Sequence, residues 1–235
     1  MRIPPQISGS SIVALGHLNP LIFRPEWLRD KEIVVGSDFE GIAIDVIHPE
    51  IVSFKLPWGN VQVDRERLTV VAAQEPLIRN SDFFVKCFQA LPETPISAVG
   101  INRDVHFSAS SLEALHHVGD VLAPKAFWGD FVLSDGARAG GMRSLIMEQC
   151  IVKDGRRTRL DGSYGWIHVK VEPSPSTIKI PHGVFVQVND HFDLVRSDKP
   201  ADGKVAAELV SERWEASVKR SEHLIDRIME LASGT

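Results

Sequence analysis

The densest group of side chains able to do chemistry is a short polar segment, Asn189 to Asp193, that follows the apolar run VFVQV of residues 184–188. The carboxylates of Asp190 and Asp193 and the imidazole of His191 are groups that ligate metals or transfer protons near neutral pH. Asn and Asp are also typical of strand ends, where their side chains satisfy the backbone of a turn. Because no second cluster stands at a defined spacing, the strand-end turn is the preferred interpretation of Asp190, His191 and Asp193.

A second group is basic. Lys153, Arg156, Arg157 and Arg159 surround Asp154-Gly155, a strong two-residue hairpin turn. A basic β-ribbon can enter a nucleic-acid groove. A solvated hairpin tip that prevents edge-to-edge pairing has the same composition. Contact between the hairpin 153–159 and nucleic acid is therefore a hypothesis beside the solvated tip.

Motifs of the common enzyme classes are absent from the sequence. It contains no serine nucleophile elbow, Walker loop, Rossmann glycine fingerprint or Cys-x-x-Cys pair. The two cysteines, Cys87 and Cys150, are too few for a disulfide framework or a thiolate metal site. We therefore predict no catalytic residue, no metal site and no cofactor, and we lean against an enzyme.

The composition is that of a globular protein. Of 235 residues, 43% are hydrophobic and 24% charged, with a net charge of −5 and a pI near 6.0. An acidic balance gives no general support for binding nucleic acid or an anionic membrane. The start of the chain has prolines where a signal peptide needs an unbroken apolar stretch, and no segment approaches the roughly 20 apolar residues of a membrane span. We expect a cytoplasmic protein without membrane contact.

The order of predicted elements indicates an α+β fold with antiparallel sheets, because the connections between strands are too short for parallel crossovers. Short helices are predicted from Pro25, over 81–91 and over 111–122, and a helix of about 28 residues closes the chain. Its apolar stripe includes Val210, Trp214 and Ile225. Strands are predicted at 11–15, 42–47, 51–56, 60–63, 68–73, 96–107, 143–152, 156–160, 166–171 and 184–188.

One strand carries a charge on its apolar face. Arg103 interrupts the face formed by Val99, Ile101, Val105 and Phe107. An inward-facing guanidinium needs an ionic partner, such as one of the acids of the preceding strands, Asp45 or Asp64.

The elements divide into two halves, 1–125 and 126–235, each with a strand meander followed by a helix. We predict one compact unit with a fused core, and a degenerate duplication is compatible with this plan. The last helix is longer than one small sheet requires, so part of its stripe is expected to meet the other half or a second copy of the chain.

Several segments together have a distinctive character, among them GINRDVHF at 100–107 and NDHFDL at 189–194. With SIVALGHLNPLIFRPEWL at 11–28, they resemble a sporadically distributed, uncharacterised bacterial protein family. The resemblance covers most of the chain and implies a bacterial cytoplasmic protein. It carries no catalytic residue over to this sequence.

The function that the sequence favours is that of a non-enzymatic interaction or assembly protein, self-associating as a homodimer or binding another protein. Exposed edges of short meanders must be covered or paired, which favours self-association. The alternative is a nucleic-acid-associated protein that uses the hairpin 153–159.

Overall fold

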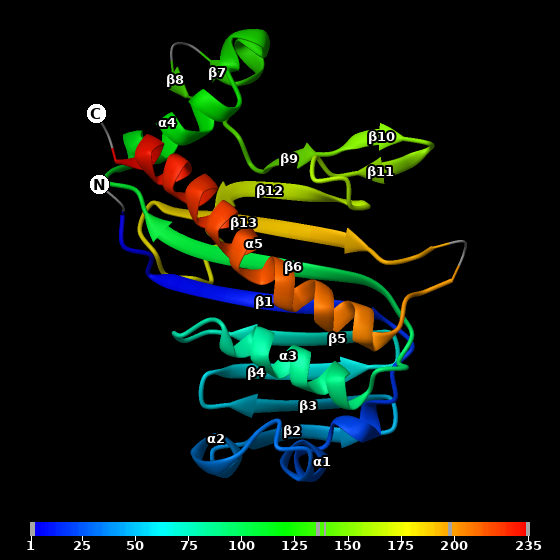
Figure 1. Cartoon of the computed structure of the whole chain (residues 1–235). Helices are drawn as coiled ribbons and strands as arrows, with labels where there is room; N and C mark the ends of the chain where they lie inside the picture. The colour runs from blue at the N-terminus through cyan, green and yellow to red at the C-terminus, as the bar shows by residue number, and fades with distance from the viewer. Residues whose placement is uncertain (1–2, 135–136, 139, 197–198, 234–235) are drawn as a thin grey trace.

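In the computed structural model, which describes residues 3–134, 137–138, 140–196 and 199–233, one large antiparallel sheet forms the centre of the protein (Figure 1). Its nine strands lie in the order β2 (Ala43–His48), β3 (Ile51–Leu56), β4 (Gly59–Asp64), β5 (Arg67–Ala72), β1 (Ile7–Gly16), β6 (Ile96–Ser108), β13 (Gly183–Asp193), β12 (Gly165–Pro173) and β9 (Leu145–Gln149). Two further strand pairs are β7 (Leu133–Ser134) with β8 (Ala137–Arg138) and β10 (Ile151–Lys153) with β11 (Arg156–Thr158). The helices are α1 (Pro25–Asp30), α2 (Gly36–Glu40), α3 (Arg79–Ala90), α4 (Leu112–Leu122) and α5 (Gly203–Ala232), with short 3-10 turns η1 (Pro20–Phe23), η2 (Lys125–Phe127) and η3 (Gly129–Phe131).

The predicted α+β class, the antiparallel strands and the long C-terminal helix are confirmed. The two meanders belong to one sheet, because β6 pairs with β13 along the whole of β13, from Gly183 opposite Ser108 to Asp193 opposite Ala98. The order of elements repeats from β6 onward: a first strand, a helix, a meander whose last strand returns beside the first, and a closing helix. The duplication itself stays a prediction.

The helices α3 and α5 lie on the same face of the sheet, and α5 crosses it diagonally (Figure 1). Alternation along the strands produces that buried face: in β13, for example, Val184, Val186 and Val188 are buried while the residues between them are half-exposed. Asp202 caps the start of α5: its side chain accepts a hydrogen bond from the backbone N–H of Val205.

The helix α5 joins two apolar clusters. Val210, near its start, packs in the cluster formed with α3 and the strands β1 and β3–β6. Ile225 and Met229, near its end, pack in a second cluster with α4 and the strands β6, β12 and β13. Between them the buried positions of α5 are Ser217 and Ser221, so a polar zone separates the two clusters along the helix.

Two expectations about local structure were wrong. The strand predicted at 143–152 is interrupted at Cys150: residues 145–149 pair with β12, whereas 151–153 pair with β11 in a separate hairpin. The partner of Arg103 is not Asp45 or Asp64 but Glu222 on α5, at 2.7 Å. The buried guanidinium of Arg103 therefore meets the helix that covers the sheet.

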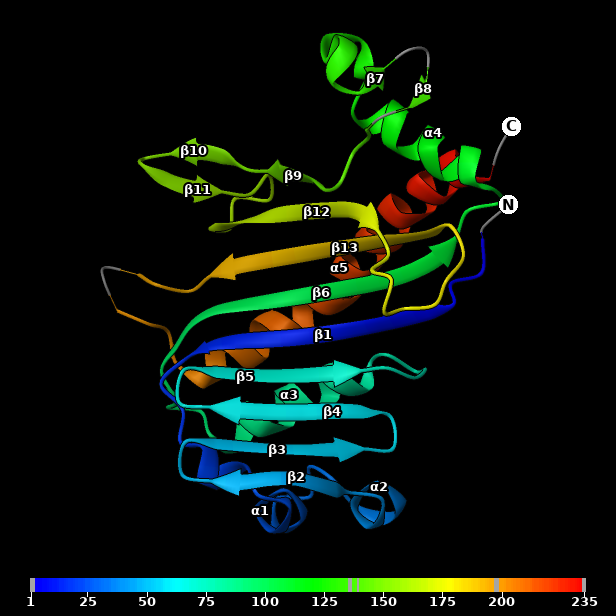
Figure 2. The ribbon, with the colours of Figure 1, turned by 180° about the vertical axis from the view of Figure 1, so that it is seen from behind.

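The face of the sheet opposite α3 and α5 has no helix over it in the described part of the chain (Figure 2). Antiparallel sheets commonly have one face toward solvent, which the half-exposed alternate residues of β12 and β13 reflect. None of the described helices has the length and apolar character needed to span a bilayer.

Candidate functional site

The polar segment Asn189–Asp193 lies inside β13 and does not follow it, so the interpretation as a strand-end turn is wrong. Successive side chains of a strand point to opposite faces of a sheet. Asp190 therefore points toward α5, while His191 and Asp193 lie on the open face. The three groups do not converge on one ligand, and among the described residues no group of three or more His, Cys, Asp and Glu could hold a metal ion.

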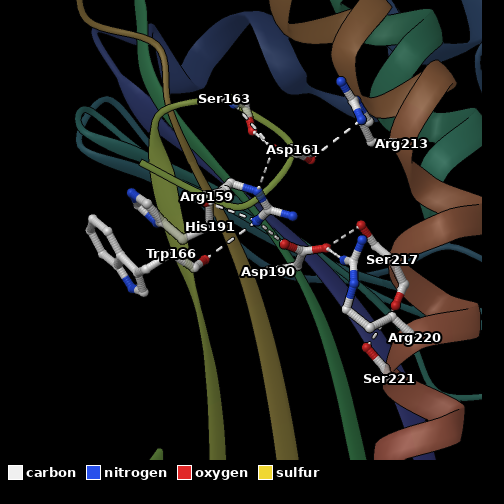
Figure 3. A network of polar contacts seen from close by, with 10 residues as sticks. All are labelled: Arg159, Asp161, Ser163, Trp166, Asp190, His191, Arg213, Ser217, Arg220 and Ser221. Atoms are coloured by element: carbon white, nitrogen blue, oxygen red, sulfur yellow. Dashed lines mark hydrogen bonds and ion pairs between the residues drawn. The ribbon is translucent and has the colours of Figure 1, made fainter. Parts of the chain in front are cut away.

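Asp190 is the centre of a buried polar network (Figure 3). Its side chain is fully buried, and one carboxylate oxygen accepts a hydrogen bond from the guanidinium of Arg159. The other oxygen accepts bonds from the hydroxyl of Ser217 at 2.5 Å and from Nη1 of Arg220 at 2.5 Å. The carboxylate is thus held by charge-assisted bonds from a loop and from α5, which fix its position.

Arg159 connects this network to the segment between β11 and β12. Its side chain is only 2% exposed, and Nη1 also lies within 3.4 Å of the backbone carbonyls of Trp166 and His191. Asp161 lies 3.5 Å from Nε of Arg159 and 3.4 Å from Arg213 on α5. Burial alone would raise the pKa of Asp161, but hydrogen bonds from Ser163 and the charges of Arg159 and Arg213 lower it.

The network acts as a clamp between sheet, hairpin and helix. It lies where α5 passes from one apolar cluster to the other, at Ser217 and Ser221. Both oxygens of Asp190 are engaged by protein donors, and the two arginines that bind it are permanently charged. The geometry therefore serves positioning: it holds the base of the β10–β11 hairpin against α5.

The open face beside the clamp carries a stack of rings. The indole of Trp166 stacks on the imidazole of His191, with centroids 3.8 Å apart. The guanidinium of Arg157 lies 5.0 Å from the indole centroid, and Arg157 is also 3.3 Å from Glu148 on β9. Burial lowers the pKa of His191, helped by the charges of His168, Arg159 and Arg157 and opposed by Asp193.

The basic residues of the hairpin differ in burial and in partners. Arg159 is buried at Asp190, and Arg156 donates to Asp193 at 3.0 Å and to the carbonyl of Val195 at 2.8 Å. The side chain of Arg157 is half-exposed beside Glu148, and Lys153 is exposed on β10. Of the four residues that the sequence suggested as a nucleic-acid contact, Arg156, Arg157 and Arg159 thus have acidic partners within the protein, and the contact itself stays a prediction.

Exposed apolar side chains lie on the edge strand β9, which ends the sheet, and on the following strand β10 of the hairpin. We call the residues Ile146, Met147, Ile151 and Val152 the β9 edge surface. Their exposed fractions are 57%, 59%, 50% and 75%. In the described part of the chain β9 pairs with β12 alone, so the backbone groups on its outer side have no strand partner.

Three aromatic side chains project from the segment after α4. Phe127 is 92% exposed, Trp128 58% and Phe131 79%. We call residues 125–131 the aromatic arm. It lies beyond one end of β9, while the β10–β11 hairpin extends beyond the other (Figures 1 and 2). The sequence reasoning missed this arm; its signal is the run AFWGDF at 126–131, which follows a helix and shows no periodicity of its own.

No protein-family model matches the chain, and no curated protein matches it. The resemblance to a sporadically distributed bacterial family therefore stays a prediction, and the function must be inferred from the geometry.

Proposed function

We propose that the protein is a cytoplasmic, non-enzymatic assembly protein that binds another polypeptide chain along β9. The observation that carries this proposal is the coincidence of an edge strand with exposed apolar side chains at Ile146 and Met147. Edge strands are normally protected by charge, bulges or a covering element, since an open edge is a template for pairing. Ile146 and Met147 are successive residues and point to opposite faces of the sheet, so exposed apolar side chains flank this edge on both sides.

The other edge of the sheet shows such protection. A register shift between Ile44 and Val46 bends β2 away from regular pairing. Lys55 and Asp45 form an ion pair at 3.7 Å beside it, and α1 and α2 lie near this edge (Figure 1). The strand β2 also carries exposed apolar side chains, Ile44 at 53% and Ile47 at 41%, but its pairing is interrupted by a bulge, whereas the register of β9 with β12 is unbroken. This difference supports β9 as the edge used for binding.

The clamp around Asp190 supports the same proposal. A hairpin next to an interaction strand needs a fixed orientation if it is to contribute to binding. Arg159, one residue after β11, anchors the hairpin to Asp190 and through it to Ser217 of α5. The network therefore pre-organises the β9 edge surface instead of performing chemistry.

The test is photo-crosslinking inside the cells that produce the protein. The crosslinking residue p-benzoylphenylalanine is placed at Met147 or at Val152, and at Gln62 on the exposed part of β4 as a control. We expect covalent protein adducts at 147 and 152 and none at 62. Absence of any adduct at 147 and 152 would overturn the proposal.

A second candidate is nucleic-acid contact through the hairpin, which two side chains favour. Lys153 is exposed, and the side chain of Arg157 is 51% exposed over the ring of Trp166. Proteins that bind single-stranded nucleic acid combine cationic side chains with aromatic rings on which the bases stack. The acid Glu148 beside Arg157 weakens this candidate, because it neutralises the local charge.

A further inference from the structure

Resting on the proposed function, we propose that the partner of the β9 edge is a second copy of this chain. Two β9 strands pair antiparallel about a two-fold axis that is perpendicular to the sheet and passes beside Met147. The two nine-stranded sheets become one continuous sheet with the helices of both copies on the same side. The aromatic arm of each copy then packs on the β10–β11 hairpin of the other.

The placement of the two apolar groups carries this inference. The arm lies beyond one end of β9 and the hairpin beyond the other end (Figures 1 and 2). A two-fold axis through the strand reverses its direction, so it brings the arm of one copy to the hairpin of its partner. Both contacts form at once, which is the property of an isologous interface.

The chemistry of the two groups is complementary. The arm offers Phe127 and Phe131, which are 92% and 79% exposed, and the hairpin offers Ile151 and Val152, which are 50% and 75% exposed. Charges also match, because the arm carries the exposed Asp130 and the hairpin carries the exposed Lys153.

The strand itself is compatible with self-pairing. About an axis at Met147, Ile146 faces Glu148 and Leu145 faces Gln149, so no two like charges are opposed. Glu148 is already bound by His168 at 2.6 Å and by Arg157 at 3.3 Å.

Stable interfaces bury about 1,200–2,000 Å² in total. A five-residue strand is too small for that alone, and the two arm–hairpin contacts supply the remainder.

The experiment is sedimentation velocity on the full chain, from about 1 to about 100 μM, a range in which a dimer with a micromolar dissociation constant forms from monomers. We expect the unchanged protein to dimerise. Met147→Lys and Met147→Glu each place like charges against each other at the axis, and we expect each to weaken dimerisation by about tenfold or more. Mixed in equal amounts, the two variants should form a heterodimer with near-original affinity. Gln62→Lys, which adds a charge far from β9, should dimerise normally.

Met147 is 59% exposed, so its variants are expected to fold, and equal circular dichroism and melting temperature verify this. An unchanged protein that remains monomeric at 100 μM overturns the second copy as partner, and so do single variants that dimerise normally. If the mixture of the Met147→Lys and Met147→Glu variants stays monomeric, the two-fold axis does not pass beside Met147, and the proposed symmetry is overturned. If crosslinks at Met147 reach only a different protein, the proposed function survives and this inference fails.

Discussion

The buried carboxylate of Asp190 gives the sharpest prediction about stability. The replacement Asp190→Asn preserves size, removes the charge that Arg159 and Arg220 share, and turns one of the two accepting oxygens into an NH2 donor. The side chain of Arg220 is 36% exposed and can turn toward solvent, whereas that of Arg159 is 2% exposed and cannot. The variant therefore buries a guanidinium with a weakened counter-charge.

Removing one partner of a buried ion pair costs about 3–5 kcal/mol. Arg159 keeps Asp161 at 3.5 Å and the carbonyl of Trp166 at 3.4 Å, so we expect the lower end of that range, about 3 kcal/mol. In a chain of this length, 3 kcal/mol lowers the melting temperature by about 6–12 °C. The urea midpoint should fall by about 1 M, taking a slope of about 3 kcal/mol/M.

The assay is equilibrium urea unfolding followed by far-ultraviolet circular dichroism. Asp161→Asn is the matched control: its side chain is 28% exposed, and we expect a loss of about 1 kcal/mol or less. The double variant Asp190→Asn/Arg159→Met removes the uncompensated charge and should recover part of the loss. A loss below about 1 kcal/mol for Asp190→Asn would refute the account of the clamp, as would a double variant less stable than the sum of its single changes.

Three other predictions concern separate regions. Burial lowers the pKa of His191 below its usual 6.5, so the unfolded state binds a proton at this residue at a higher pH than the folded state does. The free energy of unfolding should therefore fall as the pH drops below about 6.5. In urea unfolding, His191→Asn should flatten this decline. If the decline is as steep without His191, its titration is not the cause. Trp214 donates from Nε1 to Oδ1 of Asn80 at 3.2 Å. Trp214→Phe should therefore lower the free energy of unfolding by about 1–3 kcal/mol, because it leaves a buried acceptor unpaired. An unchanged melting temperature would contradict this. If the hairpin binds nucleic acid, fluorescence anisotropy with a labelled single strand should show binding that weakens as the salt concentration rises. The double variant Lys153→Ala/Arg157→Ala should abolish this binding. A double variant that still binds the strand would exclude the hairpin as the contact.

Local patterns predicted most of the scaffold, because alternation and helical periodicity depend on residues near one another in sequence. The strand around Val186 and the helix around Ile225 are examples. The extension of β13 through Asp190 was missed, since a polar segment after an apolar run has the composition of a turn. Its polarity is explained by partners at Arg159 and Ser217, 31 and 27 residues away along the chain.

The candidate site was predictable only in part for the same reason. The residue types of the hairpin were visible in the sequence, but the burial of Arg159 depends on the position of α5, which no local pattern reports. Arg103 was expected to need a partner, and its partner, Glu222, lies 119 residues away. The aromatic arm at Phe127 and Phe131 has no periodic signal, so only the fold shows that its rings project into solvent.

Hydrogen exchange of the β9 amides tests the central claim most directly, namely that this edge pairs with a second copy. Exchange at residues 145–149 is measured by mass spectrometry at protein concentrations well below and well above the dimer dissociation constant, with residues 43–48 of β2 as the internal control. The account predicts that the β9 amides become protected as the concentration rises, while the β2 amides exchange at a constant rate. Equal exchange of β9 at all concentrations would contradict it.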